Sequence, residues 1–199
     1  KLKKITFILL TIVIAIFWDK IEPYIDSNLN HNYQSNKIIK FDLNGDMREY
    51  LLHIPKNIQP NASLVFVLHG LSSTALQIQE NTRMDSVADK NGFVVCYPQG
   101  SSSTEKTIYT EKGSYFWNVG YEIHKNETVD DIFFLKSLAV FLQQKYNLNP
   151  KKTFCTGMSN GGDMSYLLAC EAPDIFKGIA TITGCMMGWI YNSCSKNDP

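Results

Sequence analysis

The stretch TFCTGMSNGGDMSYLLAC, residues 153–170, decides the fold of this chain. Its apolar start, Thr153–Thr156, predicts a short strand, and its end, Gly161–Cys170, predicts a helix. Between the two lies the pattern G-x-S-x-G, which reads GMSNG at residues 157–161. Between a strand and a helix this pattern is typical of a sharp, strained turn that exposes a serine hydroxyl above a parallel sheet.

The residues of this turn each have a predicted role. Gly157 and Gly161 let the chain fold back on itself without steric clashes. Ser159 is the candidate nucleophile, and it lies at the N-terminus of the following helix, an end that stabilises negative charge. The backbone N–H of Asn160 is expected to point toward a developing oxyanion. Together these residues predict a nucleophile elbow.

A second part of the site is expected after an earlier strand. Leu64–Leu68 is a continuous apolar run, which favours a central strand buried on both faces of a parallel sheet. In the residues that follow, Gly70 permits close approach of a substrate, and the N–H of Leu71 is the candidate second oxyanion donor. His69 precedes the nucleophile, whereas the base of such a site follows it in the chain. We therefore interpret His69 as a structural residue that hydrogen-bonds the loop, with a place in the substrate pocket as the alternative.

The remaining chain alternates strands and helices. A turn signal at residues 44–46 joins two strands into a predicted hairpin. A long polar loop, residues 99–128, precedes a strongly amphipathic helix. We expect a hairpin over 38–54, strands at Phe93–Tyr97 and Gly178–Thr183, and helices at 74–90 and Val129–Tyr146. This order predicts an α/β domain with a mostly parallel sheet flanked by helices.

Several residues outside the elbow have two interpretations. Trp117, in the long loop, either lines an acyl or aromatic pocket or anchors the loop. Asp130 and Asp131 either bond loop backbone near the site or cap the helix that they precede. Ser72–Thr74 are expected to cap the next helix rather than to take part in the chemistry.

The catalytic set is incomplete in this sequence. A serine needs a base to act as a nucleophile. The four histidines, all of which precede Ser159, are His31, His53, His69 and His124. Asp163 and Asp174 belong to the helix after the nucleophile and to its end, so neither suits the acid role. We therefore predict that this chain by itself lacks efficient triad catalysis, and we expect it to be truncated before its Asp and His segments.

The composition excludes several classes of protein. Hydrophobic residues make up 44% and charged residues 19%, which argues against a disordered chain. Nineteen Lys and Arg balance nineteen Asp and Glu, so the formal net charge is zero. This balance argues against a basic surface that binds nucleic acid.

Residues 1–30 are typical of a targeting segment. Three lysines lie among the first four residues and precede the uncharged stretch Ile5–Trp18. A helix over that stretch would span roughly 21 Å, which is short for a membrane core of about 30 Å. A signal peptide is therefore favoured, and an uncleaved signal anchor, the only membrane contact we expect, is the alternative. Residues 31–199 are expected to form the N-terminal part of the folded α/β domain.

The five cysteines are too few for a disulfide scaffold. Cys96 and Cys155 lie in apolar strands and are expected to be buried thiols. In an exported protein, one pair among Cys170, Cys185 and Cys194 is expected to be able to bridge. No spacing resembles a zinc site, and no metal or organic cofactor is implied.

With these motifs the chain resembles the secreted polyhydroxybutyrate depolymerase and feruloyl esterase-like family of α/β-hydrolases, which is similar to carbohydrate esterase family 1. The resemblance covers about Arg48 to Gly184. Its landmarks are Arg48–Tyr50 with Pro55, Leu68–Gly70, Gly92–Val95, Tyr97–Gly100, Trp117-Asn118, Val129–Asp131 with Phe134-Leu135, Gly157–Gly162, Leu168–Asp174 and Phe176–Gly184. Asp163 departs from the family pattern, which more often has an apolar residue there.

The resemblance implies an α/β-hydrolase fold, incomplete here after the nucleophile helix and one further strand. It implies a secreted serine esterase that acts on polymer-linked esters, either hydroxyalkanoate polymers or feruloylated and acetylated polysaccharides, with Ser159 as nucleophile. The resemblance assigns no catalytic Asp or His, because the family's motifs for these residues have no match in this sequence. The alternative is a catalytically inactive binding protein with a hydrolase fold, which the absence of a histidine after Ser159 favours.

Overall fold

Within the described residues, 37–194, a computed structural model shows a six-stranded central sheet. The strands lie in the order β1-β2-β4-β3-β7-β8. Neighbours from β4 to β8 run parallel, and β2 runs antiparallel to both β1 and β4. The strands are β1 (Ile39–Leu43), β2 (Asp46–His53), β3 (Leu64–Leu68), β4 (Val94–Pro98), β7 (Thr153–Met158) and β8 (Ile179–Ile182). The mostly parallel α/β sheet expected from the sequence is confirmed.

The predicted hairpin is formed by β1 and β2. Leu43 pairs with Asp46 across a two-residue turn in which Asn44 and Gly45 both have positive φ, 55° and 94°. Asn-Gly is the pair that such a tight turn favours, because both central residues must leave the right-handed region. The antiparallel β2 therefore begins at the edge of the sheet where the parallel strands end.

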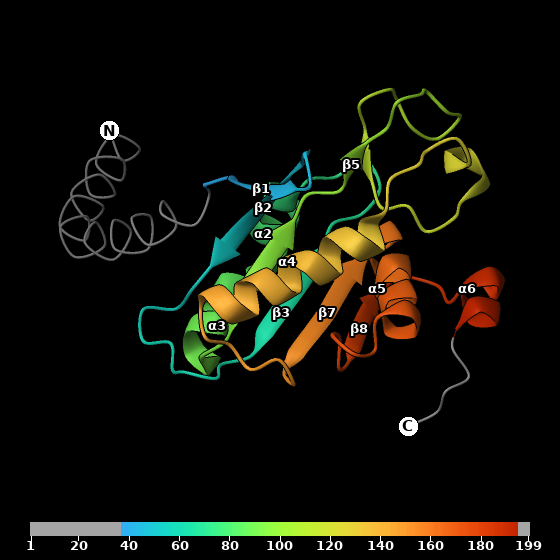
Figure 1. The fold of residues 1–199 in the computed structure, drawn as a ribbon. Coiled ribbons are helices and arrows are strands. Elements are labelled where there is room, and N and C mark those ends of the chain that lie inside the picture. Colours follow the sequence, from blue (N-terminus) through green and yellow to red (C-terminus); the bar gives the residue numbers. More distant parts are fainter. Residues whose placement is uncertain (1–36, 195–199) are drawn as a thin grey trace, which may run out of the picture. The chain divides into compact units, whose positions relative to one another are not determined.

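Two apolar cores lie on opposite faces of the sheet, as the unbroken apolar runs require. On one face Phe66 and Leu68 of β3 pack with Phe134 and Leu138 of α4 (Asp131–Lys145). Figure 1 shows α4 crossing in front of the sheet. On the other face, side chains of β2, β3 and β4 pack against α2 (Ala75–Thr82) and α3 (Met84–Asn91). Ser159 then lies where β7 runs into α5 (Asn160–Glu171).

The single helix predicted over 74–90 is two helices. Arg83 adopts a left-handed conformation, φ 49°, and separates α2 from α3. Beside it the hydroxyl of Thr82 donates to the carbonyl of Ile78 at 2.7 Å, a bond that competes with the helical pattern. At the start of α2, Thr74 caps the helix by accepting from the N–H of Gln77, as predicted.

The long loop, 99–128, has more structure than expected. β5 (Ser101–Ser102) pairs with β6 (Tyr115–Phe116), and a 3-10 turn spans Glu122–His124. A short helix that the sequence analysis missed, α6 (Gly188–Ser193), follows β8. Within residues 37–194, no helix is both long and apolar enough to span a bilayer. The predicted targeting segment, residues 1–30, lies outside the described residues.

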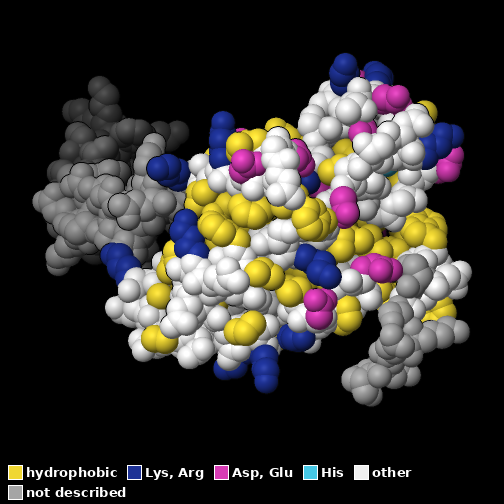
Figure 2. Space-filling model, viewed as in Figure 1, with side chains coloured by type: hydrophobic (Ala, Val, Ile, Leu, Met, Phe, Trp, Pro, Cys, Tyr) yellow, Lys and Arg dark blue, Asp and Glu magenta, His cyan; other side chains and the backbone are white. Residues whose placement is uncertain are grey.

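The face shown in Figure 2 carries charges of both signs interspersed around hydrophobic side chains. Phe133 and Val140 of α4 are among the exposed hydrophobic side chains of the described residues. On this face, Lys and Arg gather into no continuous basic stripe, in keeping with the balanced composition.

Candidate active site

Ser159 occupies a strained turn between β7 and α5. Its φ of 52° and ψ of −120° lie in a region that residues with a side chain rarely adopt. The turn is held by backbone hydrogen bonds on both sides: Ser159 N–H donates to Ile182 at 2.8 Å, and Asp163 N–H donates to Ser159 at 2.9 Å. The serine is exposed, so its hydroxyl is open to a substrate.

The glycines around the serine are sterically required. A Cβ on Gly157 would lie 2.3 Å from the Gly161 carbonyl oxygen, and a Cβ on Gly161 would lie 2.5 Å from the His69 carbonyl oxygen. Gly162 and Gly184 approach one another equally closely, since a Cβ on Gly184 would lie 2.6 Å from the Gly162 carbonyl carbon. The predicted steric reason for the pattern is therefore present, and it extends to the backbone of β3 and to the segment after β8.

The loop after β3 lies beside the nucleophile. A Cβ on Gly70 would be 3.7 Å from the Cβ of Ser159, so Gly70 allows this close approach. Within residues 37–194, the backbone N–H groups of Leu71 and Asn160 have no hydrogen-bond acceptor. Two unpaired donors on the chain next to Ser159 are what an oxyanion-binding arrangement requires.

His69 supports this loop from behind. Its ring is fully buried, with Nδ1 2.8 Å from the Gly70 carbonyl oxygen and Nε2 2.9 Å from Gly100 N. The amide Nε2 of Gln99 also lies 2.9 Å from His69 Nε2. Because a carbonyl only accepts and an N–H only donates, these bonds select the neutral ring protonated at Nδ1. Burial lowers the pKa of His69 to about 4. The structural interpretation of His69 fits these contacts, and its buried ring presents no surface to a pocket.

Trp117 also anchors the loop rather than lining a pocket. Its fully buried indole donates from Nε1 to the His69 carbonyl at 2.9 Å. The Asn160 side chain accepts from Trp117 N–H at 2.8 Å and donates to the Trp117 carbonyl at 3.0 Å. Sequence reasoning assigned only the backbone of Asn160, and no local signal indicated that its amide bridges the nucleophile helix to residue 117.

Asp130 and Asp131 divide the two predicted roles between them. Asp130 caps α4 by accepting from Phe133 N–H at 2.9 Å. Asp131 is buried and accepts from Arg48 Nη2 at 2.6 Å and from Asn118 N–H at 2.8 Å. Burial raises the pKa of the Asp131 carboxyl, and the adjacent guanidinium opposes that rise. One aspartate therefore ends the loop, and the other holds it against the hairpin.

Asp163, for which the sequence suggested no role, joins three segments. This buried carboxylate in the first turn of α5 accepts from the hydroxyl of Tyr121 in the long loop. Its other oxygen accepts from Cys185 N–H at 2.6 Å, in the segment after β8. Nearby, the indole of Trp189 donates to the Val119 carbonyl at 2.8 Å. An apolar side chain at residue 163 would leave both of its donors without this acceptor.

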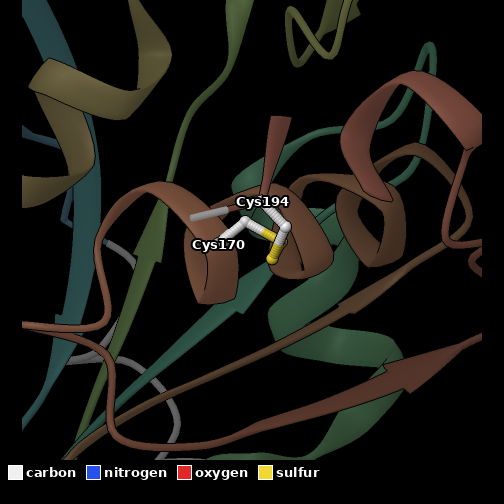
Figure 3. Close-up of a disulfide and its surroundings, with 2 residues drawn as sticks. All are labelled: Cys170 and Cys194. Carbon is white, nitrogen blue, oxygen red and sulfur yellow. A yellow bond between two sulfur atoms is a disulfide. The ribbon is translucent and has the colours of Figure 1, made fainter. Parts of the chain in front are cut away.

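A disulfide ties the segment after β8 to the nucleophile helix. Cys170, near the end of α5, bonds to Cys194, just past α6 (Figure 3). This is one of the three pairings that the sequence left open, and it leaves Cys185 free and exposed. Cys96 and Cys155 are buried free thiols, as predicted, and burial raises the pKa of both.

The described histidines do not complete a triad. His53 lies 2.8 Å from a carboxylate oxygen of Asp89, and the ring of His69 is hydrogen-bonded within its own loop, to the Gly70 carbonyl. His124 is buried against Phe116, with ring centroids 4.0 Å apart, and neither of its ring nitrogens has a hydrogen-bond partner. Among residues 37–194, no group of three or more metal-binding side chains is placed to hold an ion.

Comparison with known proteins identifies a family whose sequence model matches most of this chain. The sequence model described as Esterase PHB depolymerase matches residues 49–198. Acetylxylan esterase A of Talaromyces purpureogenus is 24% identical over 74% of this chain and 36% of its own length. Poly(3-hydroxyalkanoate) depolymerase C of Paucimonas lemoignei is 26% identical over 76% of this chain and 35% of its own length.

Solved structures share the fold. An acetyl xylan esterase from Aspergillus awamori superposes with a TM-score of 0.60 at 18% identity, over 82% of this chain and 58% of its own. An S-formylglutathione hydrolase from Agrobacterium tumefaciens gives a TM-score of 0.60 at 17% identity, over 74% of this chain and 57% of its own. The α/β-hydrolase fold expected from the sequence is therefore confirmed. The chain spans little more than a third of the length of the two curated relatives described above.

Proposed function

Because the chain belongs to the Esterase PHB depolymerase family, we propose that the protein is a serine carboxylic-ester hydrolase that acts on polymer-linked esters. The observation that carries the proposal is the exposed Ser159 in a strained elbow, beside the unpaired N–H groups of Leu71 and Asn160. Relatives named as acetylxylan esterase, poly(3-hydroxyalkanoate) depolymerase and feruloyl esterase support the ester chemistry.

In the proposed reaction the oxygen of Ser159 attacks the ester carbonyl carbon and forms an acyl-enzyme, and the alcohol leaves. The N–H groups of Leu71 and Asn160 hold the oxygen that becomes negative in the tetrahedral intermediate. Water then attacks the acyl carbonyl, releases the acid and restores the serine.

The serine must lose its proton to a base during the attack. None of the described histidines, His53, His69 and His124, is hydrogen-bonded to Ser159. We therefore assign the base, and the acid that orients it, to parts of the protein outside residues 37–194.

Export of the protein is part of the proposal. A disulfide between Cys170 and Cys194 persists in an oxidising compartment, outside the cytoplasm. The lysine-flanked apolar segment within residues 1–30 would direct that export, as a cleaved signal peptide or as an anchor.

Ser159→Ala tests the proposal in the full-length protein that contains this chain. We expect hydrolysis of 4-nitrophenyl acetate to fall by more than about a thousand-fold, since the nucleophile is removed. The matched control is Ser86→Ala, which changes an exposed serine of α3 and should leave the rate within about two-fold. Undiminished turnover by the Ser159 variant would rule out the assignment.

The second candidate function is non-catalytic binding of a polymer. The absence of a hydrogen bond between Ser159 and any described histidine favours it. The same assay separates the two functions, because a binding protein retains the elbow yet gives no turnover that depends on Ser159.

A further inference from the structure

A groove opens on the same edge of the sheet as Ser159, on the side of the hairpin. Its volume is about 570 Å³, and its walls come from four separate segments. They are Asp46–Glu49, Gln99–Ser102 with Thr104, Tyr115 and Glu127–Asp130. The start of β2 and the end of β4 meet here because the two strands are antiparallel.

The groove shares its wall with the loop that lies beside the nucleophile. Gly100 N–H donates to His69 Nε2 at 2.9 Å, and Ser72 N–H donates to the Tyr115 carbonyl at 2.8 Å. Gly70, between these contacts, approaches Ser159 closely. Strands β7, β3, β4 and β2 are successive neighbours. The near wall of the groove, just after β4, therefore lies two strand spacings, roughly 10 Å, from the end of β7, and the start of β2 lies three spacings, roughly 14 Å, from it. An acetyl group alone bridges neither distance, but a polymer chain attached to it does.

The lining of the groove is polar and rich in hydrogen-bond acceptors. Carboxylates from Asp46, Glu49 and Glu127 contribute to it, together with hydroxyls of serine, threonine and tyrosine. Glu49 is half buried, and within the described residues its carboxylate has no hydrogen-bond or ion-pair partner. The basic residue of the lining, Arg48, pairs with Asp131 through Nη2, whereas its buried Nη1 has no hydrogen-bond partner among the described residues and lies 3.9 Å from a carboxylate oxygen of Asp46. The groove therefore suits a neutral ligand whose groups both donate hydrogen bonds, to carboxylates such as that of Glu49, and accept them, from Arg48.

This chemistry separates the two polymer classes that the family suggests. A polysaccharide carries many hydroxyl groups, each of which can donate to a carboxylate. A hydroxyalkanoate polyester carries ester oxygens that only accept, so it would leave Glu49 unpaired and desolvated, which is unfavourable. The half-buried ring of Tyr115 adds an amphipathic surface, with an apolar face and a hydroxyl, against which a sugar ring can pack.

We propose that this groove is a carbohydrate subsite that holds the hydroxyl-bearing backbone of an esterified polysaccharide while its ester group lies at Ser159. The proposal rests on the proposed esterase function, and it assigns the substrate to the polysaccharide esters rather than to the polyesters. Tyr115 and Glu49 are its specificity-determining residues.

The experiment compares two substrates on the full-length protein that contains this chain: an acetylated xylo-oligosaccharide, which can fill the groove, and 4-nitrophenyl acetate, which cannot. We expect Tyr115→Ala and Glu49→Ala each to lower the ratio of kcat/KM for the oligosaccharide to kcat/KM for the aryl ester by about ten-fold. The loss should appear mainly in KM. Tyr109→Ala is the matched control, because it removes an exposed tyrosine of the same loop that does not line the groove.

Direct binding provides a readout that does not depend on turnover. In a Ser159→Ala background, calorimetry with unesterified xylo-oligosaccharide should show binding that the added Tyr115→Ala change weakens about ten-fold. Thermal melting of each variant identifies any that fail to fold, and Glu49→Ala then serves in place of Tyr115→Ala.

The outcomes are distinguishable. Failure to hydrolyse either substrate in a Ser159-dependent way would overturn the proposed function. Ser159-dependent hydrolysis with an unchanged ratio in both folded variants would overturn the subsite and leave the esterase intact. Faster hydrolysis of 3-hydroxybutyrate oligomers than of the acetylated oligosaccharide would also overturn the subsite.

Discussion

The elbow and the long loop position their parts of the candidate site by different means. At the elbow, glycines such as Gly157 and Gly161 bring backbone against backbone, closer than any side chain would allow. In the loop, 99–128, buried side chains reach across: Asn160 bridges to Trp117, and Asp131 holds Asn118. Both regions have partners far away in the sequence, but the elbow needs only the absence of side chains, which consecutive glycine positions reveal, whereas the loop needs particular polar partners.

This contrast predicts that the elbow tolerates added volume least. In Gly161→Ala the new methyl group would lie 2.5 Å from the His69 carbonyl oxygen and 2.6 Å from that of Leu68. Both are backbone atoms, so the end of β3 must shift, and we expect the free energy of unfolding to fall by more than about 3 kcal/mol in urea denaturation. The control is Gly188→Ala in α6, where a Cβ meets nothing within 4 Å. Equal losses in the two variants would contradict the steric account.

The loop should be sensitive to charge instead. Asp131→Asn preserves the shape of the side chain but leaves the buried guanidinium of Arg48 without its anionic partner. We expect a loss of about 3 kcal/mol in the same unfolding experiment, and faster proteolysis within 99–128. Asp130→Asn is the matched control, because asparagine caps a helix as well as aspartate does. If both changes cost the same, the buried pair does not hold the loop.

The contact between the two regions should depend on pH through His69. Burial lowers the pKa of His69 from 6.5 to about 4, so the unfolded chain takes up a proton more readily than the folded protein. The contribution of neutral His69 to the free energy of unfolding is therefore fully present above pH 6.5 and is lost as the pH falls toward 4. We expect the free energy of unfolding to fall by about 2 kcal/mol between pH 7 and pH 5 for this reason. Protonation would abolish the acceptor that Nε2 offers to Gly100 and Gln99.

Urea denaturation at a series of pH values checks this prediction. The wild-type protein should lose stability more steeply than His69→Gln below pH 6.5. The remaining slope of the variant contains His124, whose pKa burial lowers in the same direction. Parallel slopes for the two proteins would show that the His69 ring does not carry the effect.

Most of the fold was predictable because its signals are local. The apolar run of β3 and the turn at residues 44–46 indicated their structures from a few neighbouring residues, and both are confirmed. The helix over 74–90 was predicted wrongly as one element, since its break depends on the left-handed Arg83 and on a hydroxyl bond from Thr82. The helix α6 was missed because it is short, and its indole contact lies in a distant loop.

The sequence by itself determined the parallel sheet, the elbow at Ser159 and the loop of Gly70 beside it, because each follows from the conformational limits of consecutive residues. Only the tertiary structure decided that Cys194 pairs with Cys170 and that Asp163 receives hydrogen bonds from two other segments. The tertiary structure also decided that Trp117 is buried and anchors its loop by donating to the His69 carbonyl. The physical reason is shared: a buried polar or sulfur atom takes its role from the partner that folding brings within bonding distance, and that partner lies elsewhere in the chain.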